Sequence, residues 1–210
     1  MSIYALKGRF QALLRPAVSR LHGAGATANQ VTVTAALVSL AVAWVVYRHA
    51  PTHPALYALL PLWMLLRMAL NAIDGMLARE FGQQSRLGAY LNELGDVVAD
   101  SALFLALLGV PGVPPVLVWA LVVTALLTEY AGVLGVPVGA SRRYDGPMGK
   151  SDRAFVIGAL GLALAPGWVG AGAAGGVLAA MSVLCAVTVW RRVARGLDEA
   201  RRAGGQNRNA

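Results

Sequence analysis

Residues 71–100 read NAIDGMLAREFGQQSRLGAYLNELGDVVAD, and this stretch decides how the rest of the chain is interpreted. It places charged side chains inside or beside two long apolar runs: Asp74, Arg79, Glu93, Asp96 and Asp100. A charge at mid-membrane depth costs about 2.5–3.5 kcal/mol on insertion scales, so such residues usually face a wet cavity, a partner or a cation. Their clustering in one helix–loop–helix predicts a functional site there.

The composition around this stretch is typical of a membrane protein. The chain has 210 residues, of which 57% are hydrophobic and 13% charged, about half the charged fraction of soluble domains. Apolar runs of about 20 residues predict membrane spans. Six such runs are present: Val31–Tyr47, Ala55–Ala78, Leu87–Val110, Val113–Leu134, Ala154–Ala165 and Trp168–Trp190. The fifth run is short, so we expect it to extend back toward Ser151, to pair closely with the sixth, or to be partly interfacial.

Lysine and arginine residues predict the orientation of these spans. They gather before the first span, between the second and third, between the fourth and fifth, and after the sixth, whereas the opposite loops hold only Arg48. The positive-inside rule then puts both termini, and the polar hairpin of residues 71–100, at the cytoplasmic face of the inner membrane. The net charge of +8 is explained by this topology, and no soluble module is present to bind nucleic acid.

Three regions follow from the composition. Residues 1–26 form a cytoplasmic juxtamembrane segment, in which Ile3–Leu21 predicts an amphipathic helix on the inner leaflet, broken near Pro16. Residues 27–195 form the membrane domain. Residues 196–210 are polar and contain glycine and arginine, which predicts a disordered tail. The predicted fold is an all-α integral membrane protein with six transmembrane helices after an N-terminal amphipathic helix.

Polar residues recur at helical spacing on both sides of the short loop EFGQQSR. The second span carries Asn71 and Asp74, and the third carries Asn92, Asp96 and Asp100 at steps of four. Antiparallel helices joined by a short loop can bring these two faces together. Hard oxygen ligands suit Mg²⁺ or Mn²⁺, which are commonly shared with substrate phosphates. The alternative is a structural polar clamp between the helices.

At these residues the chain resembles the CDP-alcohol phosphotransferases, also called CDP-alcohol phosphatidyltransferases, a family of six-helix membrane enzymes. The family pattern is DxxDGxxAR, eight residues, then GxxxDxxxD, and the chain matches it in type and spacing at Asp74-Gly75, Ala78-Arg79, Gly88 and Asp96. Upstream, residues 27–32 (TANQVT) resemble the TPNxxT that precedes the first span in the family, with alanine in place of proline.

The resemblance implies that four aspartates bind two divalent cations, which grip the diphosphate of CDP. The corresponding residues here form the predicted Mg²⁺ or Mn²⁺ site: Asn71, Asp74, Asn92 and Asp96. Compared with aspartate, Asn71 and Asn92 each keep a side-chain oxygen but lack the negative charge, so we expect weaker metal binding. Whether the site binds one cation or two remains open. Glu93 and Asp100 lie within a turn of Asp96 and can offset the lost charge.

The resemblance also implies the reaction and its participants. A CDP-linked lipid such as CDP-diacylglycerol transfers its phosphatidyl group to a small acceptor alcohol and releases CMP, in phospholipid biosynthesis. Asp96 is the implied general base. The implied nucleotide-binding residues are Gly75, Ala78, Arg79 and Gly88, although Arg79 also fits a positive-inside anchor. The family further implies a homodimer.

The loop before the fifth span suggests how an acceptor is recognised. Residues 141–153 (SRRYDGPMGKSDR) gather four cations suited to a phosphate dianion: Arg142, Arg143, Lys150 and Arg153. Gly149-Lys150 resembles the GK of phosphatidylglycerophosphate synthases, which favours glycerol 3-phosphate, but Asp152-Arg153 stands where those enzymes have lysine and threonine. An inositol phosphate, serine or a second lipid remains open as the acceptor.

Other interpretations also remain open. Arg67, inside the second span, can pair with Glu129 or with an acid of the site. A transporter would have ionisable residues along a path across the bilayer, whereas the acids here lie toward one face and no inverted repeat is visible. A non-catalytic CDP-lipid-binding member of the family is the second alternative, and the retained Asp96 argues for an enzyme.

Overall fold

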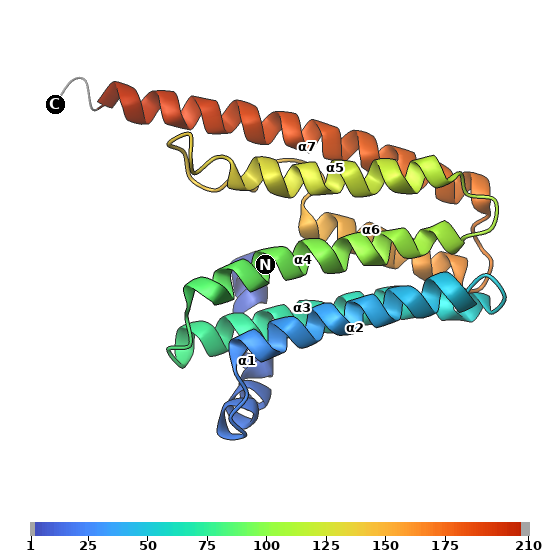
Figure 1. Cartoon of the computed structure of the whole chain (residues 1–210), viewed down its shortest axis with the longest axis horizontal. Helices are drawn as coiled ribbons and strands as arrows, with labels where there is room; N and C mark the ends of the chain where they lie inside the picture. Colours follow the sequence, from blue (N-terminus) through green and yellow to red (C-terminus); the bar gives the residue numbers. More distant parts are fainter. Residues whose placement is uncertain (1–2, 207–210) are drawn as a thin grey trace.

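Helices make up every regular element of the computed structural model, which describes residues 3–206 (Figure 1). The elements are α1 (Ile3–Gly23), α2 (Ala28–His49), η1 (Pro54–Ala58), α3 (Leu59–Glu80), α4 (Arg86–Leu105), η2 (Ala106–Gly109), α5 (Pro115–Val133), α6 (Lys150–Leu164) and α7 (Ala171–Gln206), where η denotes a 3₁₀-helix. The predicted all-α class is confirmed for this range. Residues 1–2 and 207–210, at the ends of the predicted juxtamembrane segment and tail, lie outside it.

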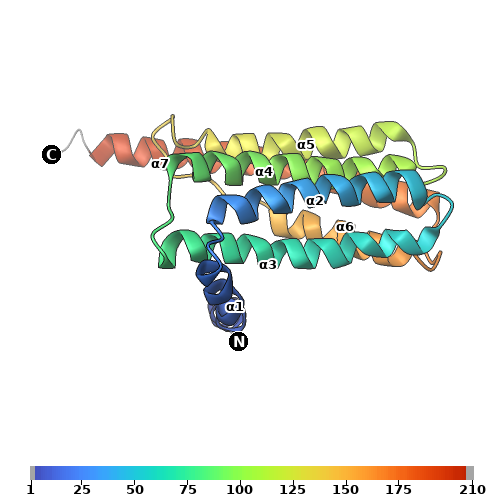
Figure 2. The ribbon, with the colours of Figure 1, turned by 60° about the horizontal axis from the view of Figure 1, so that its bottom comes forward.

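Helices α2 to α7 form an elongated bundle, and α1 projects from it at a steep angle (Figures 1 and 2). α2 packs against both α3 and α4, α5 packs against α7, and α6 packs against α3. The α3–α4 and α5–α6 connections lie at the end of the bundle where α7 terminates (Figure 1). The polar hairpin and the basic loop are therefore at the same end.

Within residues 3–206, four helices are long and apolar enough to cross a membrane: Ala28–His49, Pro54–Glu80, Pro115–Val133 and Ala171–Ala203. The other two predicted spans differ for separate reasons. α4 carries Glu93, Asp96 and Asp100 within its 20 residues. α6 has 15 residues, about 22 Å of helix against a hydrocarbon core of about 30 Å. Length and composition thus identify four of the six predicted spans.

The N-terminal helix continues through Pro16, so the predicted break there is wrong. Val18, two residues later, is buried against Ile73, Met76 and Leu77 of α3. This packing holds the second half of α1 in place on the bundle although Pro16 cannot donate a backbone hydrogen bond. The side chains of residues 3–9 lie outside the described part of the chain.

The ends of the last two helices differ from the apolar pattern. α6 begins at Lys150, so the short fifth apolar run does extend back past Ser151, which was one of the three predicted alternatives. At this end of the helix, the Gly149 amide donates a hydrogen bond to Asp152 Oδ2 at 2.9 Å. α7 remains helical to Gln206, which corrects the predicted disorder from residue 196. Glu199 explains part of this order, because it accepts a hydrogen bond from the Ser141 amide at 2.8 Å.

A close backbone approach fixes α6 against α3 and η1. A Cβ added to Gly161 would lie 2.8 Å from the Tyr57 carbonyl oxygen and 2.9 Å from Leu60 Cβ. Only a glycine allows the helices to pack at this separation. The same packing positions the first turn of α6, which carries Lys150 and Arg153.

Gly161→Ala is expected to destabilise the bundle by about 1–3 kcal/mol, because the new methyl group overpacks a contact with backbone. The measurement is thermal unfolding of the purified protein in detergent. Gly176→Ala is the matched control, since a Cβ at Gly176 of α7 meets nothing within 4 Å. Equal midpoints for the two variants would contradict this packing.

Candidate functional site

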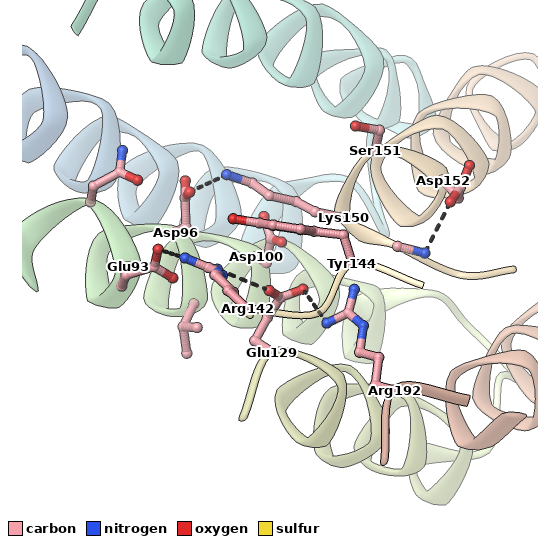
Figure 3. A pocket seen from close by; sticks show the side chains of 13 residues that line it. Glu93, Asp96, Asp100, Glu129, Arg142, Tyr144, Lys150, Ser151, Asp152 and Arg192 are labelled. Atoms are coloured by element: carbon pink, nitrogen blue, oxygen red, sulfur yellow. Dashed lines mark hydrogen bonds and ion pairs between the residues drawn. The ribbon is translucent and has the colours of Figure 1, made fainter. Parts of the chain in front are cut away.

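A polar cavity of about 440 Å³ lies between α4, α5, α6, α7 and the loop before α6 (Figure 3). Most of its lining side chains are ionisable or polar: Asn92, Glu93, Asp96, Asp100, Glu129, Arg142, Tyr144, Lys150, Ser151, Asp152 and Arg192, with Val97 and Gly149. The lining holds five acids and three bases, and each base lies within 4 Å of an acid of the lining. Such a lining can bind a charged, phosphate-bearing molecule.

Asp96 has three side-chain partners in and beside this cavity. Its Oδ1 accepts hydrogen bonds from Arg67 Nη2 at 3.0 Å and from Asn71 Nδ2 at 3.1 Å. Its Oδ2 forms an ion pair with Lys150 (Figure 3). The polar faces of α3 and α4 therefore meet through side chains, while α2 packs against both helices.

Arg67 pairs with acids of the site and not with Glu129. Its guanidinium forms an ion pair with Asp100 and contacts both the side chain and the backbone carbonyl of Asp96. Arg67 is only 5% exposed. The alternative that the sequence left open is thus decided in favour of the acids on α4.

The four predicted metal residues lie on α3 and α4 at the cavity and behind it. Asn92 and Asp96 line the cavity, whereas Asp74 is buried and accepts a hydrogen bond from Thr32 Oγ1 at 2.8 Å. Within residues 3–206 no cluster of three or more His, Cys, Asp or Glu side chains has metal-binding geometry. Two carboxylates and two amides can supply hard oxygen donors to a divalent cation, but with half the negative charge of four aspartates.

The predicted nucleotide-binding residues lie away from the cavity lining. A Cβ at Gly75 would lie 3.0 Å from Arg79 Nη2, so the guanidinium of Arg79 folds back over Gly75. A Cβ at Gly88 would lie 2.8 Å from Asn29 Oδ1, so Gly88 permits α2 and α4 to approach. Ala78 packs at the edge of the small core beneath α1.

The four cations predicted for an acceptor phosphate occupy different environments. Arg142 and Lys150 line the cavity. Arg143 points to another partner set, Asp145 and Glu199. Burial alone would raise the pKa of Asp145, but hydrogen bonding and charge from Arg143 outweigh it and the pKa is lowered. Arg143 therefore anchors the loop to α7.

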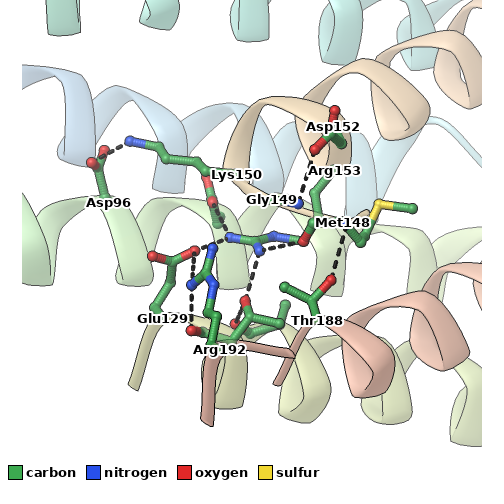
Figure 4. A network of polar contacts seen from close by, with 12 residues as sticks. Asp96, Glu129, Met148, Gly149, Lys150, Asp152, Arg153, Thr188 and Arg192 are labelled. Carbon is green, nitrogen blue, oxygen red and sulfur yellow. Dashed lines mark hydrogen bonds and ion pairs between the residues drawn. The ribbon is translucent and has the colours of Figure 1, made fainter. Parts of the chain in front are cut away.

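Arg153 lies behind the cavity wall and is 1% exposed. Its guanidinium donates to Thr128 Oγ1 and Glu129 Oε1, each at 2.7 Å, and to the Met148 carbonyl at 3.2 Å (Figure 4). It also lies 3.7 Å from Asp100 Oδ2. Arg153 thus links α6 to α5 and α4, and we call it a structural hub for this reason.

Arg192 is a site residue whose importance the sequence did not reveal, and it shares the acid Glu129 with two other arginines. Glu129 lies within 3.9 Å of three arginines: Arg142, Arg153 and Arg192. Arg192 is 3% exposed and donates to the carbonyls of Thr128 and Asp145. In the sequence, Arg192 is one of several arginines after the last predicted span. In the structure, it lies within the 36-residue helix α7, which runs past the cavity and places Arg192 in its lining.

An apolar groove of about 580 Å³ lies on α4 and α5 beside the polar cavity. The two share Glu93, Val97 and Glu129. The remaining groove residues are apolar or aromatic: Ala89, Tyr90, Leu94, Leu126, Leu127, Tyr130 and Val133. A polar site is thus continuous with a surface suited to hydrocarbon.

Arg153→Met is expected to lower the free energy of unfolding by about 3–5 kcal/mol, because it leaves buried acids without their partner. Chemical or thermal unfolding in detergent measures the change. Arg15→Met is the control: the Arg15–Glu80 pair has side chains 64% and 37% exposed, and its loss should cost less than about 1 kcal/mol. A small effect of both substitutions would contradict the assignment of Arg153 as a hub.

Two known proteins are similar to this chain in sequence. The inner membrane protein YnbA of Escherichia coli is 46% identical over 171 residues, covering 80% of this chain and 84% of YnbA. The archaetidylinositol phosphate synthase of Aeropyrum pernix is 35% identical over 92 residues, covering 44% of this chain and 47% of that protein.

A solved structure supports the fold independently. The phosphatidylinositol phosphate synthase PgsA1 of Mycobacterium tuberculosis, in complex with manganese and citrate, has a TM-score of 0.73 at 21% identity and covers 87% of this chain and 88% of its own. With CDP-DAG bound, the same enzyme has a TM-score of 0.72, again at 21% identity, covering 88% and 92%. A profile of the CDP-alcohol phosphatidyltransferases, transferases that use divalent metals, matches residues 26–190, and the chain belongs to this family.

Proposed function

We propose that this chain transfers the phosphatidyl group of a CDP-linked lipid, such as CDP-diacylglycerol, to a phosphorylated alcohol and releases CMP. One observation carries the proposal. Asp96, the predicted base, opens onto the same cavity as three cations, Arg142, Lys150 and Arg192. A phosphorylated alcohol bound by these cations would have its hydroxyl group within the cavity that holds the base.

The reaction forms one bond and breaks one. The acceptor hydroxyl oxygen attacks the lipid-linked phosphorus, a phosphoester bond forms, and the phosphoanhydride bond to CMP breaks. Asp96 accepts the hydroxyl proton as general base. Asn71 and Arg67 fix the orientation of the Asp96 carboxylate through its Oδ1. The apolar groove on α4 and α5 is suited to a lipid substrate.

A divalent cation completes this site in the proposal. Asp74 and Asp96, with the amide oxygens of Asn71 and Asn92, would hold Mg²⁺ or Mn²⁺. When bound, such a cation neutralises the diphosphate and the leaving CMP. PgsA1, which shares the fold, has been solved with manganese. The nucleotide would lie near Gly75, Ala78, Arg79 and Gly88, as the family pattern implies.

The proposed acceptor is inferred from the cations of the cavity and from the names of two similar proteins. Gly149-Lys150 favours glycerol 3-phosphate by resemblance. Two relatives, however, bear names of inositol phosphate enzymes, the PgsA1 and Aeropyrum pernix proteins. Both alcohols carry a phosphate that Arg142, Lys150 and Arg192 can bind, so we place an inositol phosphate first and glycerol 3-phosphate second.

The membrane arrangement is part of the proposal. α4 and α6 expose apolar side chains on their outer surfaces, such as Leu94, Val98, Phe155 and Leu162, while the charged side chains of Asp100 and Arg153 are buried. We therefore propose that all six helices span the membrane. The distribution of lysine and arginine places both termini and the cavity on the cytoplasmic side, with α1 on the inner leaflet. The family resemblance implies a homodimer. Light scattering of the detergent-solubilised protein measures the oligomeric state.

Asp96→Asn is expected to lower CMP release by at least about three orders of magnitude, because it removes the proton acceptor and keeps the shape. The assay uses purified protein, CDP-diacylglycerol, Mg²⁺ or Mn²⁺ and a panel of alcohols, with the lipid product identified by mass. Asp198→Asn, on the exposed end of α7, is the control and should retain activity. Full turnover by a folded Asp96→Asn protein would exclude Asp96 as base.

Lys150→Met and Arg142→Met are expected to raise the Michaelis constant for a phosphorylated acceptor by about 10–100-fold, since each removes a charge-assisted hydrogen bond of about 1.5–3 kcal/mol. The constant for the CDP-lipid should change much less. Arg191→Met, beside Arg192 but exposed, is the matched control. If serine or free inositol proves the preferred acceptor, the phosphate-binding role is wrong.

A further inference from the structure

A buried guanidinium occupies the space between the acids of α4. Arg67 enters from α3, and its side chain is 6% exposed. It donates to Asp96 Oδ1 at 3.0 Å and to the Asp96 carbonyl at 3.1 Å, and it forms an ion pair with Asp100, one turn further along α4. A fixed positive charge thus joins Asp96, a candidate metal ligand, to Asp100, which lies one turn away on α4.

The neighbouring Asn71 also directs a hydrogen-bond donor at Asp96. Asn71 lies one turn after Arg67 on α3 and presents its amide nitrogen to Asp96 Oδ1 at 3.1 Å. An aspartate at position 71 would place a second carboxylate oxygen against Asp96, which requires a cation between the two. The amide donates a hydrogen bond instead, so this contact is satisfied without a metal ion.

The ion pairs support the same conclusion. Asp96 already contacts Arg67 and Lys150, and Asp100 contacts Arg67 and lies 3.7 Å from Arg153. Asp74 differs from the other two acids, because its contact is the Thr32 hydroxyl at 2.8 Å and not a guanidinium. The Asp74 side of the site therefore suits a metal ion better than the Arg67 side.

The structure assigns Arg67 the place of one of the two divalent cations that the family pattern implies, so that each chain binds a single Mg²⁺ or Mn²⁺. Arg67 is a built-in cation that compensates for Asn71 and Asn92. This inference rests on the proposed function for the identity of the site, and its test measures metal binding rather than transfer.

Titration of the purified full chain in detergent with Mn²⁺, following free Mn²⁺ by electron paramagnetic resonance, counts the sites directly. The expected result is one bound Mn²⁺ per chain. Two bound ions of similar affinity, or none at millimolar concentration, would overturn the inference. The unmodified protein decides this point, so the result does not depend on whether a variant folds.

Two variants test the role of Arg67 itself. Asn71→Asp/Asn92→Asp restores the family's four acids but keeps the guanidinium, and it should still bind one Mn²⁺. Adding Arg67→Met should raise the number to two. The control is a triple variant that combines Asn71→Asp and Asn92→Asp with Arg48→Met, a substitution in the last turn of α2. It should still bind one Mn²⁺ per chain. A second Mn²⁺ in the double variant would show that Arg67 does not block the site.

CMP release by the same preparation separates this inference from the proposed function. Transfer by a protein that binds two Mn²⁺ would refute the role of Arg67 and keep the function. A single Mn²⁺ in a protein that transfers no lipid to any acceptor would keep the role of Arg67 and refute the function.

Discussion

A continuous chain of buried ion pairs holds this bundle together. It runs from Arg67 on α3 to Asp100 on α4, Arg153 on α6, Glu129 on α5 and Arg192 on α7. Signs alternate at every step, so each charge removed from water has a partner in the next helix. In a low-dielectric interior the loss of one partner leaves an uncompensated charge. The relative positions of five helices thus depend on one electrostatic pattern.

This pattern explains why two helices that look poorly suited to a membrane belong in the bundle. α4 and α6 carry the acids and Arg153 that the chain of ion pairs requires, and those side chains are covered by neighbouring helices. Their outward surfaces remain apolar, as Leu94 and Phe155 illustrate. Average hydropathy cannot separate an inward charge from an outward one, so it does not pick out α4, whereas α6 is too short to be picked out by length.

The sequence predicts the parts of the site that depend on spacing along one helix. Asn71 and Asp74, and likewise Asn92 and Asp96, share helix faces because 3.6 residues make a turn. Pairings between helices are not encoded in spacing. That Arg67 meets Asp96 and not Glu129, or that Arg153 is buried while Lys150 lines the cavity, depends on how α2 packs against α3 and α4 and how α6 packs against α3. Arg192 is the clearest case, since its role requires the path of a 36-residue helix.

The paired charges of the cavity bear on how an anion would enter it. Lys150 contacts Asp96, and Arg142 contacts Glu93, so neither cation is free of an acid. An acceptor phosphate competes with these acids for the same N–H donors. In the proposed reaction, a phosphate that attracts Lys150 would also draw this cation away from Asp96 Oδ2. Arg143, fixed to Asp145 and Glu199, keeps the loop in place while Arg142 changes partner. In this proposal, binding of the acceptor and release of Asp96 Oδ2 from Lys150 are one event, and an alcohol without a phosphate lacks the charge to cause it.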